Sequence, residues 1–371
     1  MKKLAAVVLS LVMMLSLTAC IAKNEDAPSK DAENNESGVN VVTGYKPGDV
    51  TLPQYKGLTF TPLSTEVTEE EIQSNLDYYV QSYKTKVEVT DRDTVQTGDI
   101  VSISYEGIKD GVAFDGGTGS TETLQIGSGT FIPGFEDALI GKSKGQFSID
   151  VTFPENYKTE ALAGQDAVFN IDLKGIYTYV YPELTDEFIA EKTDNKYTTV
   201  AEYREYIREA IKKSKESEAE EQKLYDLVNK IIDMSTFNVD LTSAIKSTVS
   251  TYKKYYDNLG SSYGLDGAGY FRIAYGTTSQ EYEDSLKKQA DYQVKFDYIK
   301  SAIADIEKFE ATDEEVEALA TSLMKSYGYT TKEAFYEVIK SNNGLDGDVF
   351  LREQIKLNKA TDLILNTAVP E

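Results

Sequence analysis

The chain has 371 residues, enough for about two or three domains, and its 40% hydrophobic and 27% charged residues are typical of a globular protein with a core. The 38 basic and 62 acidic residues give a net charge of −24, which excludes nucleic acid as a ligand because phosphate backbones need clustered Lys and Arg. With no His and a single Cys, the chain lacks the residues for His-dependent nucleophilic catalysis, imidazole zinc sites and internal disulfides. We therefore expect no metal and no cofactor.

The N-terminus has the pattern of an export signal. Lys2 and Lys3 precede an apolar stretch over residues 4–17, which is too short to span a bilayer comfortably. Residues 17–20 read Leu-Thr-Ala-Cys and resemble the lipobox of bacterial lipoproteins, in which the signal peptide is cut before the cysteine and the thiol receives a diacylglycerol. An ordinary secretory signal with a chance cysteine is the alternative, but the position of the lone Cys20 favours a lipobox.

The lipobox resemblance implies a signal peptide over residues 1–19 and lipidation of Cys20. Two acyl chains are sufficient for stable anchoring, so we expect the protein on the extracytoplasmic face of the cell membrane. Residues 20–48 are polar and contain Pro, Ser, Asn, Gly and acids, a composition that predicts a flexible tether.

Residues 49–90 are predicted to be an N-terminal helical segment that packs with the C-terminal domain. Thr68 and Glu71 have the spacing of a capping box, and Val67 with Ile72 has the spacing of a hydrophobic staple. The helix is expected to end near Lys84.

Residues 91–180 change to a period of two, which is typical of half-buried antiparallel strands. Asp110-Gly111 is a hairpin-type turn, and a short helical run over residues 135–140 lies between strands. The residues expected on the buried faces of three strands are Val101, Ile103 and Tyr105; Phe147, Ile149, Val151 and Phe153; and Phe169, Ile171 and Leu173. These patterns predict a compact α+β domain.

Residues 181–371 return to the helical period of 3.6. Three further Thr-x-x-Glu sequences predict capping boxes at Thr199/Glu202, Thr278/Glu281 and Thr312/Glu315. The similar segments 264–267 and 344–347, both Gly-Leu-Asp-Gly, are expected to be loops between helices. This part of the chain is therefore predicted to be a largely helical domain.

Several stretches of the sheet domain resemble FKBP-type peptidyl-prolyl isomerases, in the right order and with the right spacing. They are Val-Ser-Ile-Ser-Tyr-Glu-Gly at 101–107, Asp-Gly-Val-Ala-Phe-Asp at 110–115 and Ile-Gly-Ser-Gly-Thr-Phe-Ile-Pro-Gly-Phe-Glu at 126–136. Val-Thr-Phe-Pro-Glu-Asn-Tyr at 151–157 and Pro-Glu-Leu-Thr-Asp-Glu-Phe at 182–188 resemble the FKBP domain of trigger factor in particular. The helical remainder is similar to the C-terminal chaperone body of trigger factor in segment order and acidity.

The resemblance implies an α+β fold class: an FKBP-like antiparallel sheet wrapped on a short helix, plus a mainly α-helical, trigger factor-like C-terminal chaperone domain. It implies a peptidyl-prolyl cis-trans isomerase that needs no cofactor. The site residues that it implies are Tyr105, Phe114, Asp115, Phe135, Tyr157 and Phe169 around the twisting bond, with Leu124, Phe131 and Ile132 binding substrate. Periodicity alone leaves simple core packing of these aromatic residues open.

The expected partners are unfolded or proline-containing exported polypeptides, and the membrane through the lipid anchor. Nothing in residues 20–63 resembles the ribosome-docking domain of trigger factor, so we expect no ribosome as a partner. One alternative is a holdase chaperone that keeps the FKBP domain only as a scaffold. Another is a solute-receptor lipoprotein, which is disfavoured because no two-lobed α/β periodicity appears.

Overall fold

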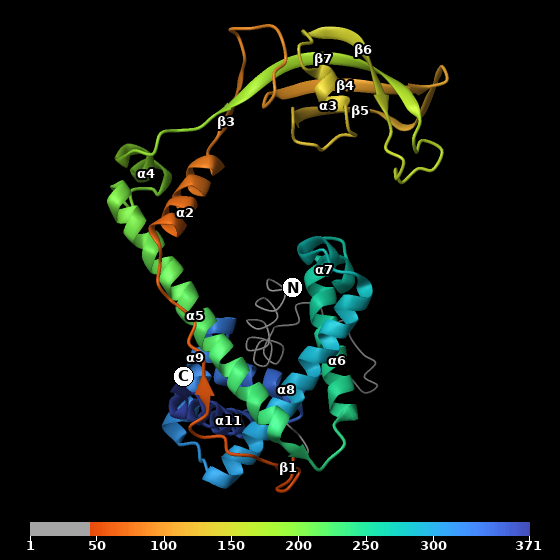
Figure 1. Cartoon of the computed structure of the whole chain (residues 1–371). Helices are drawn as coiled ribbons and strands as arrows, with labels where there is room; N and C mark the ends of the chain where they lie inside the picture. Colours follow the sequence, from red (N-terminus) through yellow and green to blue (C-terminus); the bar gives the residue numbers. More distant parts are fainter. Residues whose placement is uncertain (1–44) are drawn as a thin grey trace. The chain divides into compact units, whose positions relative to one another are not determined.

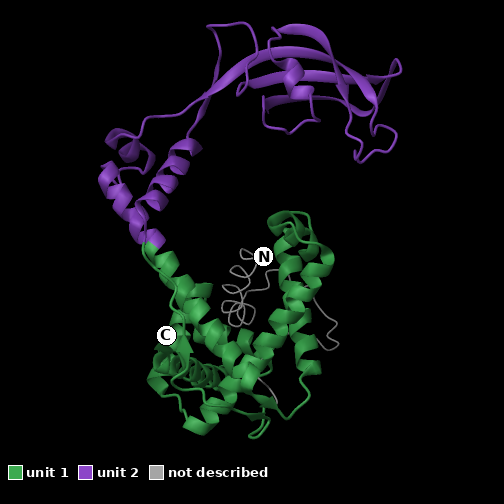
Figure 2. Ribbon diagram, viewed as in Figure 1, with its two compact units in different colours: residues 1–66, 212–371 green, residues 67–211 purple. Residues whose placement is uncertain are grey.

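The computed structural model describes residues 45–371; the predicted signal peptide and the predicted lipidation site Cys20 lie outside the described residues. The chain divides into two compact units (Figure 2). One unit contains Lys212–Glu371 and the described residues up to Glu66, and the other is Val67–Ile211. Helix α5, Val200–Met234, contributes residues to both (Figure 1).

The unit over residues 67–211 contains a five-stranded antiparallel sheet of order β3-β7-β4-β5, with β6 also paired to β7. The strands are β3 (Thr85–Glu88), β4 (Ile100–Lys109), β5 (Val112–Gln125), β6 (Gly145–Thr152) and β7 (Asp166–Val180). The short helix α3, Phe135–Leu139, packs against β6 (Figure 1). The long strand β7 is central to the sheet, because it pairs with β3, β4 and β6.

The predicted period of two is confirmed by burial in β6 and β7, whereas in β4 it is wrong for Ser102, because Ile100, Val101, Ser102 and Ile103 are all buried. Val101, Ile103, Ile149, Phe169 and Leu173 all belong to the hydrophobic core of the sheet. Strand β5 was not predicted, because its sequence from residue 112 to 125 is rich in Gly and Thr and shows no alternation of apolar residues.

A two-residue hairpin sets the register between β4 and β5. Asp110 and Gly111 both have positive φ, 51° and 81°, as the favoured two-residue hairpin turn requires. Lys109 therefore lies opposite Val112. Further along the ladder the register shifts twice, between Glu106 and Ile108 and between Val101 and Ile103, so that Val101 lies opposite Leu124. The predicted turn is confirmed.

The same unit contains a small helical cluster formed by α2 (Glu69–Ser82), α4 (Asp186–Lys192) and the start of α5. Its core consists of Ile72, Leu76, Phe188, Ile189, Tyr203 and Ile207. The predicted capping box of Thr68 and Glu71 is confirmed, and Val67 packs on the same cluster as Ile72. Within the predicted helical segment 49–90, the helix covers Glu69–Ser82 only.

The predicted capping box at Thr199 is wrong in one of its two hydrogen bonds. The Thr199 hydroxyl oxygen accepts from the Glu202 N–H at 3.1 Å, as expected. The Glu202 carboxylate, however, accepts from the N–H and hydroxyl of Thr198, at 2.7 and 2.9 Å. The Glu202 side chain thus reaches Thr198, one residue before the expected partner, and the Thr199 N–H does not donate the reciprocal bond of a capping box.

The other unit is mainly helical. Its helices are α6 (Thr242–Ser261), α7 (Gly267–Tyr275), α8 (Ser279–Glu307), α9 (Asp313–Tyr327), α10 (Lys332–Asn343), α11 (Gly347–Thr367) and the remainder of α5. The capping boxes predicted at Thr278 and Thr312 are confirmed. The two Gly-Leu-Asp-Gly segments are loops, as predicted, in which Asp266 and Asp346 cap the helices that follow.

Residues 45–66 form a strap along this helical unit. Within it, β1 (Val50–Thr51) pairs antiparallel with β8 (Thr236–Phe237), and β2 (Thr59–Phe60) pairs parallel with β9 (Val369–Pro370). Val50 is buried in the core shared by α5, α8 and α11. Within residues 45–371, no helix combines the length and apolar character needed to cross a bilayer.

Candidate functional site

Seven aromatic side chains meet on the core side of the sheet. They come from separate elements: Tyr105 from β4, Phe114 from β5, Phe131 from the loop before α3, Phe135 from α3, Phe153 and Tyr157 from the segment after β6, and Phe169 from β7. Six of them are the aromatic residues that the sequence analysis assigned to the site. The fold therefore brings together residues that lie up to 64 positions apart, from Tyr105 to Phe169.

The ring set has two layers. Phe135, Phe153 and Phe169 are buried, while Tyr105, Phe114, Phe131 and Tyr157 are half-buried and lie toward solvent. The Phe135 and Phe169 rings meet edge to face, with centroids 5.2 Å apart and planes at 84°, a favourable aromatic geometry. The half-buried layer is the part of the set that another molecule can contact.

Phe131 covers Phe135. Their rings are stacked, with centroids 4.6 Å apart and planes at 29°, and only 1% of Phe135 is exposed. Phe131 is therefore one of the rings that shield Phe135 from solvent, together with Tyr105 and Phe169.

Two glycines leave room for the half-buried rings. A Cβ on Gly107 would come within 2.4 Å of the Phe114 ring, and a Cβ on Gly119 would come within 2.6 Å of the Tyr105 hydroxyl. Real Cβ atoms do not approach so closely, so these rings lie over the backbone only because both positions are glycine. Gly107 belongs to β4 and Gly119 to β5, so a glycine of the strand that periodicity did not detect also helps to build the ring set.

The remaining predicted site residues lie in three different environments. Leu124 is buried in the sheet core. Asp115 is exposed and directly follows Phe114 in β5, and its place in the site stays a prediction. Ile132 is half-buried beside the rings, and within residues 45–371 its backbone N–H has no hydrogen-bond acceptor.

The carboxylate of Glu136 holds the loop that carries Phe131. It accepts hydrogen bonds from four backbone N–H groups, those of Gly127 (2.8 Å), Gly129 (3.0 Å), Thr130 (2.9 Å) and Phe131 (3.1 Å). Burial by itself raises the pKa of Glu136, but the backbone donors, with Gly129 first among them, outweigh it and lower the pKa below its usual value. Our sequence analysis quoted Glu136 only as part of a motif and missed this role.

We expect Glu136→Gln to lower the unfolding free energy of the isomerase domain by about 2 kcal/mol, because an amide replaces a charged acceptor of four N–H groups. Since the folded state lowers the pKa of Glu136, its carboxylate stabilises the fold above the usual pKa of a glutamate. This contribution is lost as the pH falls through the lowered value. Urea unfolding between about pH 6 and pH 3 measures both effects.

The exposed Glu106 on the same sheet provides the control. Glu106→Gln should change stability by less than about 0.5 kcal/mol. Equal stability of the two variants at neutral pH would contradict the role assigned to Glu136.

A separate hollow of about 770 Å³ lies on the opposite face of the sheet. Polar side chains from four strands line it, among them Ser104, Ser120, Ser148 and Asp172. Because side chains alternate between the two faces of a strand, these residues point away from the ring set. They provide a surface for control substitutions that leave the rings intact.

The sheet and its short helix are those of an FKBP-type domain. The family model described as FKBP-type peptidyl-prolyl cis-trans isomerase matches residues 91–174. The model of the bacterial trigger factor C-terminus matches residues 199–366.

Two curated relatives extend the similarity along both units. Trigger factor of Halalkalibacterium halodurans is 31% identical over 345 residues, covering 92% of this chain and 78% of the relative. Trigger factor of Agathobacter rectalis is 34% identical over 320 residues, covering 86% of this chain and 70% of the relative. The chain belongs to the trigger factor family, and its FKBP-type domain is a peptidyl-prolyl cis-trans isomerase.

Proposed function

We propose that this trigger factor homologue is a lipid-anchored chaperone and prolyl isomerase that acts on exported polypeptides at the extracytoplasmic face of the membrane. The observation that carries the anchoring is the position of the only cysteine, Cys20, directly after an apolar stretch and the residues Leu-Thr-Ala. The isomerase site is proposed at the aromatic ring set. Its clients are unfolded, proline-containing chains, and trigger factor family membership supports this part of the proposal.

Catalysis at the ring set is a matter of solvation and shape. Twisting an X–Pro amide through its transition state costs about 18–20 kcal/mol, because resonance is lost. The twisted amide has less charge separation than the planar one, so water stabilises the planar ground state more. An aromatic surface that excludes water removes this preference. Lowering the barrier by about 5 kcal/mol accelerates the step by between three and four decades.

Different residues of the site contact different parts of the bound peptide. Tyr105, Phe114 and Phe169 contact the pyrrolidine ring, and Phe135 becomes its floor when Phe131 moves aside. The free N–H of Ile132 donates a hydrogen bond to a substrate carbonyl and so fixes the peptide next to the rings. No proton transfer or covalent bond is required.

The alternative role of a holdase has one observation in its favour. The Phe131 ring covers Phe135, as the rings of a purely structural core would. In that case the FKBP domain would bind or position clients with negligible turnover. Cis-to-trans exchange of a Phe-Pro peptide distinguishes the two roles, because only an isomerase accelerates it.

Replacing Cys20 tests the anchor. We expect wild-type protein expressed in a bacterial host to incorporate labelled palmitate and to sediment with membranes, and Cys20→Ser to do neither, because the acceptor thiol for the lipid is gone. Labelling and membrane fractionation measure the two properties. A wild-type chain that is exported but stays unlabelled would identify the N-terminus as an ordinary secretory signal.

A further inference from the structure

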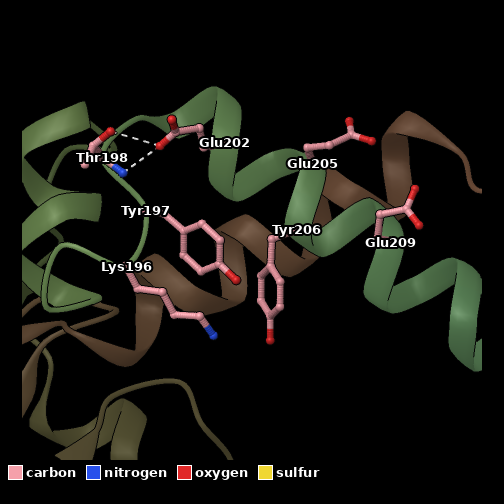
Figure 3. A pocket seen from close by; sticks show the side chains of 7 residues that line it. All are labelled: Lys196, Tyr197, Thr198, Glu202, Glu205, Tyr206 and Glu209. Atoms are coloured by element: carbon pink, nitrogen blue, oxygen red, sulfur yellow. Dashed lines mark hydrogen bonds between the residues drawn. The ribbon is translucent and has the colours of Figure 1, made fainter.

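A hollow in the helical part of the residue 67–211 unit has no role in the isomerase site. It measures about 590 Å³ and lies where the loop after α4 leads into α5. Lys196, Tyr197 and Tyr206 line it together with carboxylates of α5 (Figure 3). The sequence analysis did not predict it.

Two tyrosines in this hollow form a cation-binding pair. The rings of Tyr197 and Tyr206 have centroids 4.9 Å apart and planes at 31°. The ammonium of Lys196 lies 5.3 Å from the Tyr197 centroid and 5.5 Å from the Tyr206 centroid, within the range of cation–π attraction (Figure 3). In the part of the chain that the structure describes, Lys196 forms no ion pair, so the two rings are its defined partners.

The pair is held in place by its surroundings. The buried ring of Tyr203 lies behind both rings, at 5.4 Å from Tyr197 and 5.7 Å from Tyr206. The Thr193 hydroxyl accepts a hydrogen bond from the Tyr197 N–H at 3.2 Å and fixes the backbone of the loop. Because the two rings are already held in place, little free energy is spent on ordering them when a cation binds.

The charges around the hollow favour a cation. Glu205 pairs with Arg208 at 3.2 Å, and Glu202 accepts from Thr198 at the start of α5. The side-chain carboxylate of Glu209 has neither an ion pair nor a hydrogen bond among residues 45–371. Three carboxylates against one lysine in the lining repel anions and attract a second positive charge.

We infer that the Tyr197–Tyr206 hollow binds a Lys or Arg side chain of an unfolded polypeptide, and that Lys196 occupies the same position when no client is bound. This inference rests on the proposed chaperone function and names a feature of the client that it selects. Lys196 is then an internal competitor, which a client cation displaces from the rings. A basic client segment also offsets the strong negative charge of the chain.

The test compares two short, labelled Gly/Ser-rich peptides that differ only in two central positions, Lys or norleucine. Binding to the chain from Ile21, which contains every described residue, is followed by fluorescence anisotropy. We expect Lys196→Ala to tighten binding of the Lys peptide about threefold to fivefold, because both rings become free, and to leave the norleucine peptide unchanged. Tyr197→Leu with Tyr206→Leu should abolish the preference for Lys, and the corresponding pair of Phe substitutions should keep it.

Lys84→Ala is the matched control. It removes the same charge, and Lys84 also lies over a tyrosine ring, Tyr179, at 4.1 Å, but outside the hollow. If Lys84→Ala strengthens Lys-peptide binding as much as Lys196→Ala does, the effect is one of net charge and the inference is wrong. The inference is also wrong if wild type and Lys196→Ala bind the two peptides equally while the chain still accelerates Phe-Pro exchange and suppresses aggregation. If wild type neither accelerated Phe-Pro exchange nor suppressed aggregation, the proposed function itself would be contradicted.

Discussion

Replacing two rings of the proposed site should lower the isomerase activity strongly while leaving the chain folded. For Tyr105→Leu with Phe169→Leu, we expect kcat/KM for a Phe-Pro peptide to fall by about 10- to 100-fold. Both rings belong to the set that we propose excludes water from the bound amide, and they come from neighbouring strands, β4 and β7. Leucine fills much of the space in the core, so the loss of stability is smaller than for truncation to alanine.

The measurement is the cis-to-trans exchange rate of the peptide with the chain from Ile21. Gln146→Ala with Ser148→Ala, on the opposite face of the same sheet, is the control and should retain wild-type activity. If the folded double ring variant kept full activity, the rings would be only a core and the site would lie elsewhere. If folded wild type gave no acceleration, the holdase alternative would stand.

Truncating a central ring of the helical unit should give the largest loss of stability. Phe335 on α10 is completely buried, within a cluster that also contains Val316, Ile339, Phe350 and Leu351. We expect Phe335→Ala to lower the unfolding free energy of this unit by about 3–5 kcal/mol, because the lost burial and the remaining cavity add together. Circular dichroism during urea unfolding follows this unit, since most of the helices belong to it.

Val349→Ala serves as the control, because Val349 lies on the neighbouring helix α11 with 48% of its surface exposed. It should change the unfolding free energy by less than about 0.5 kcal/mol. In both variants we expect isomerase activity at low urea to stay within about twofold of wild type, since the ring set belongs to the other compact unit. An effect of Phe335→Ala no greater than that of Val349→Ala would show that the α9–α11 cluster contributes little to stability.

The strands with one buried face could be predicted from the sequence, because burial imposes a period of two on their residues. Strand β7 is the clearest case, with Phe169, Ile171 and Leu173 in the core. Strand β5 could not be predicted in this way, because Gly117 and Gly119 lie under aromatic rings where other strands have apolar side chains. At these two positions the fold requires glycine, because a side chain would clash with the ring above it. A search for alternating apolar residues does not detect such positions.

Six of the seven rings were predicted from motif resemblance, whereas Phe153 and the organisation of the set needed the structure. The spacing of Phe131 and Phe135 does not reveal that one ring covers the other. Nor could the sequence show that Glu136 accepts four backbone hydrogen bonds, because the loop that donates them has no regular secondary structure. The tyrosine hollow was missed for a similar reason: its cation, Lys196, follows two residues with positive φ in an irregular loop.

The strap over residues 45–66 has a consequence for the order in which the chain folds. Strand β2 pairs with β9, and the Thr59 hydroxyl donates to the Glu371 carboxylate across 312 positions of sequence. These contacts cannot form until residues 369–371 have been synthesised. Contacts within residues 67–211 need no such wait, because both partners of each are made early. The isomerase domain can thus fold while the unit that encloses it in sequence is still incomplete.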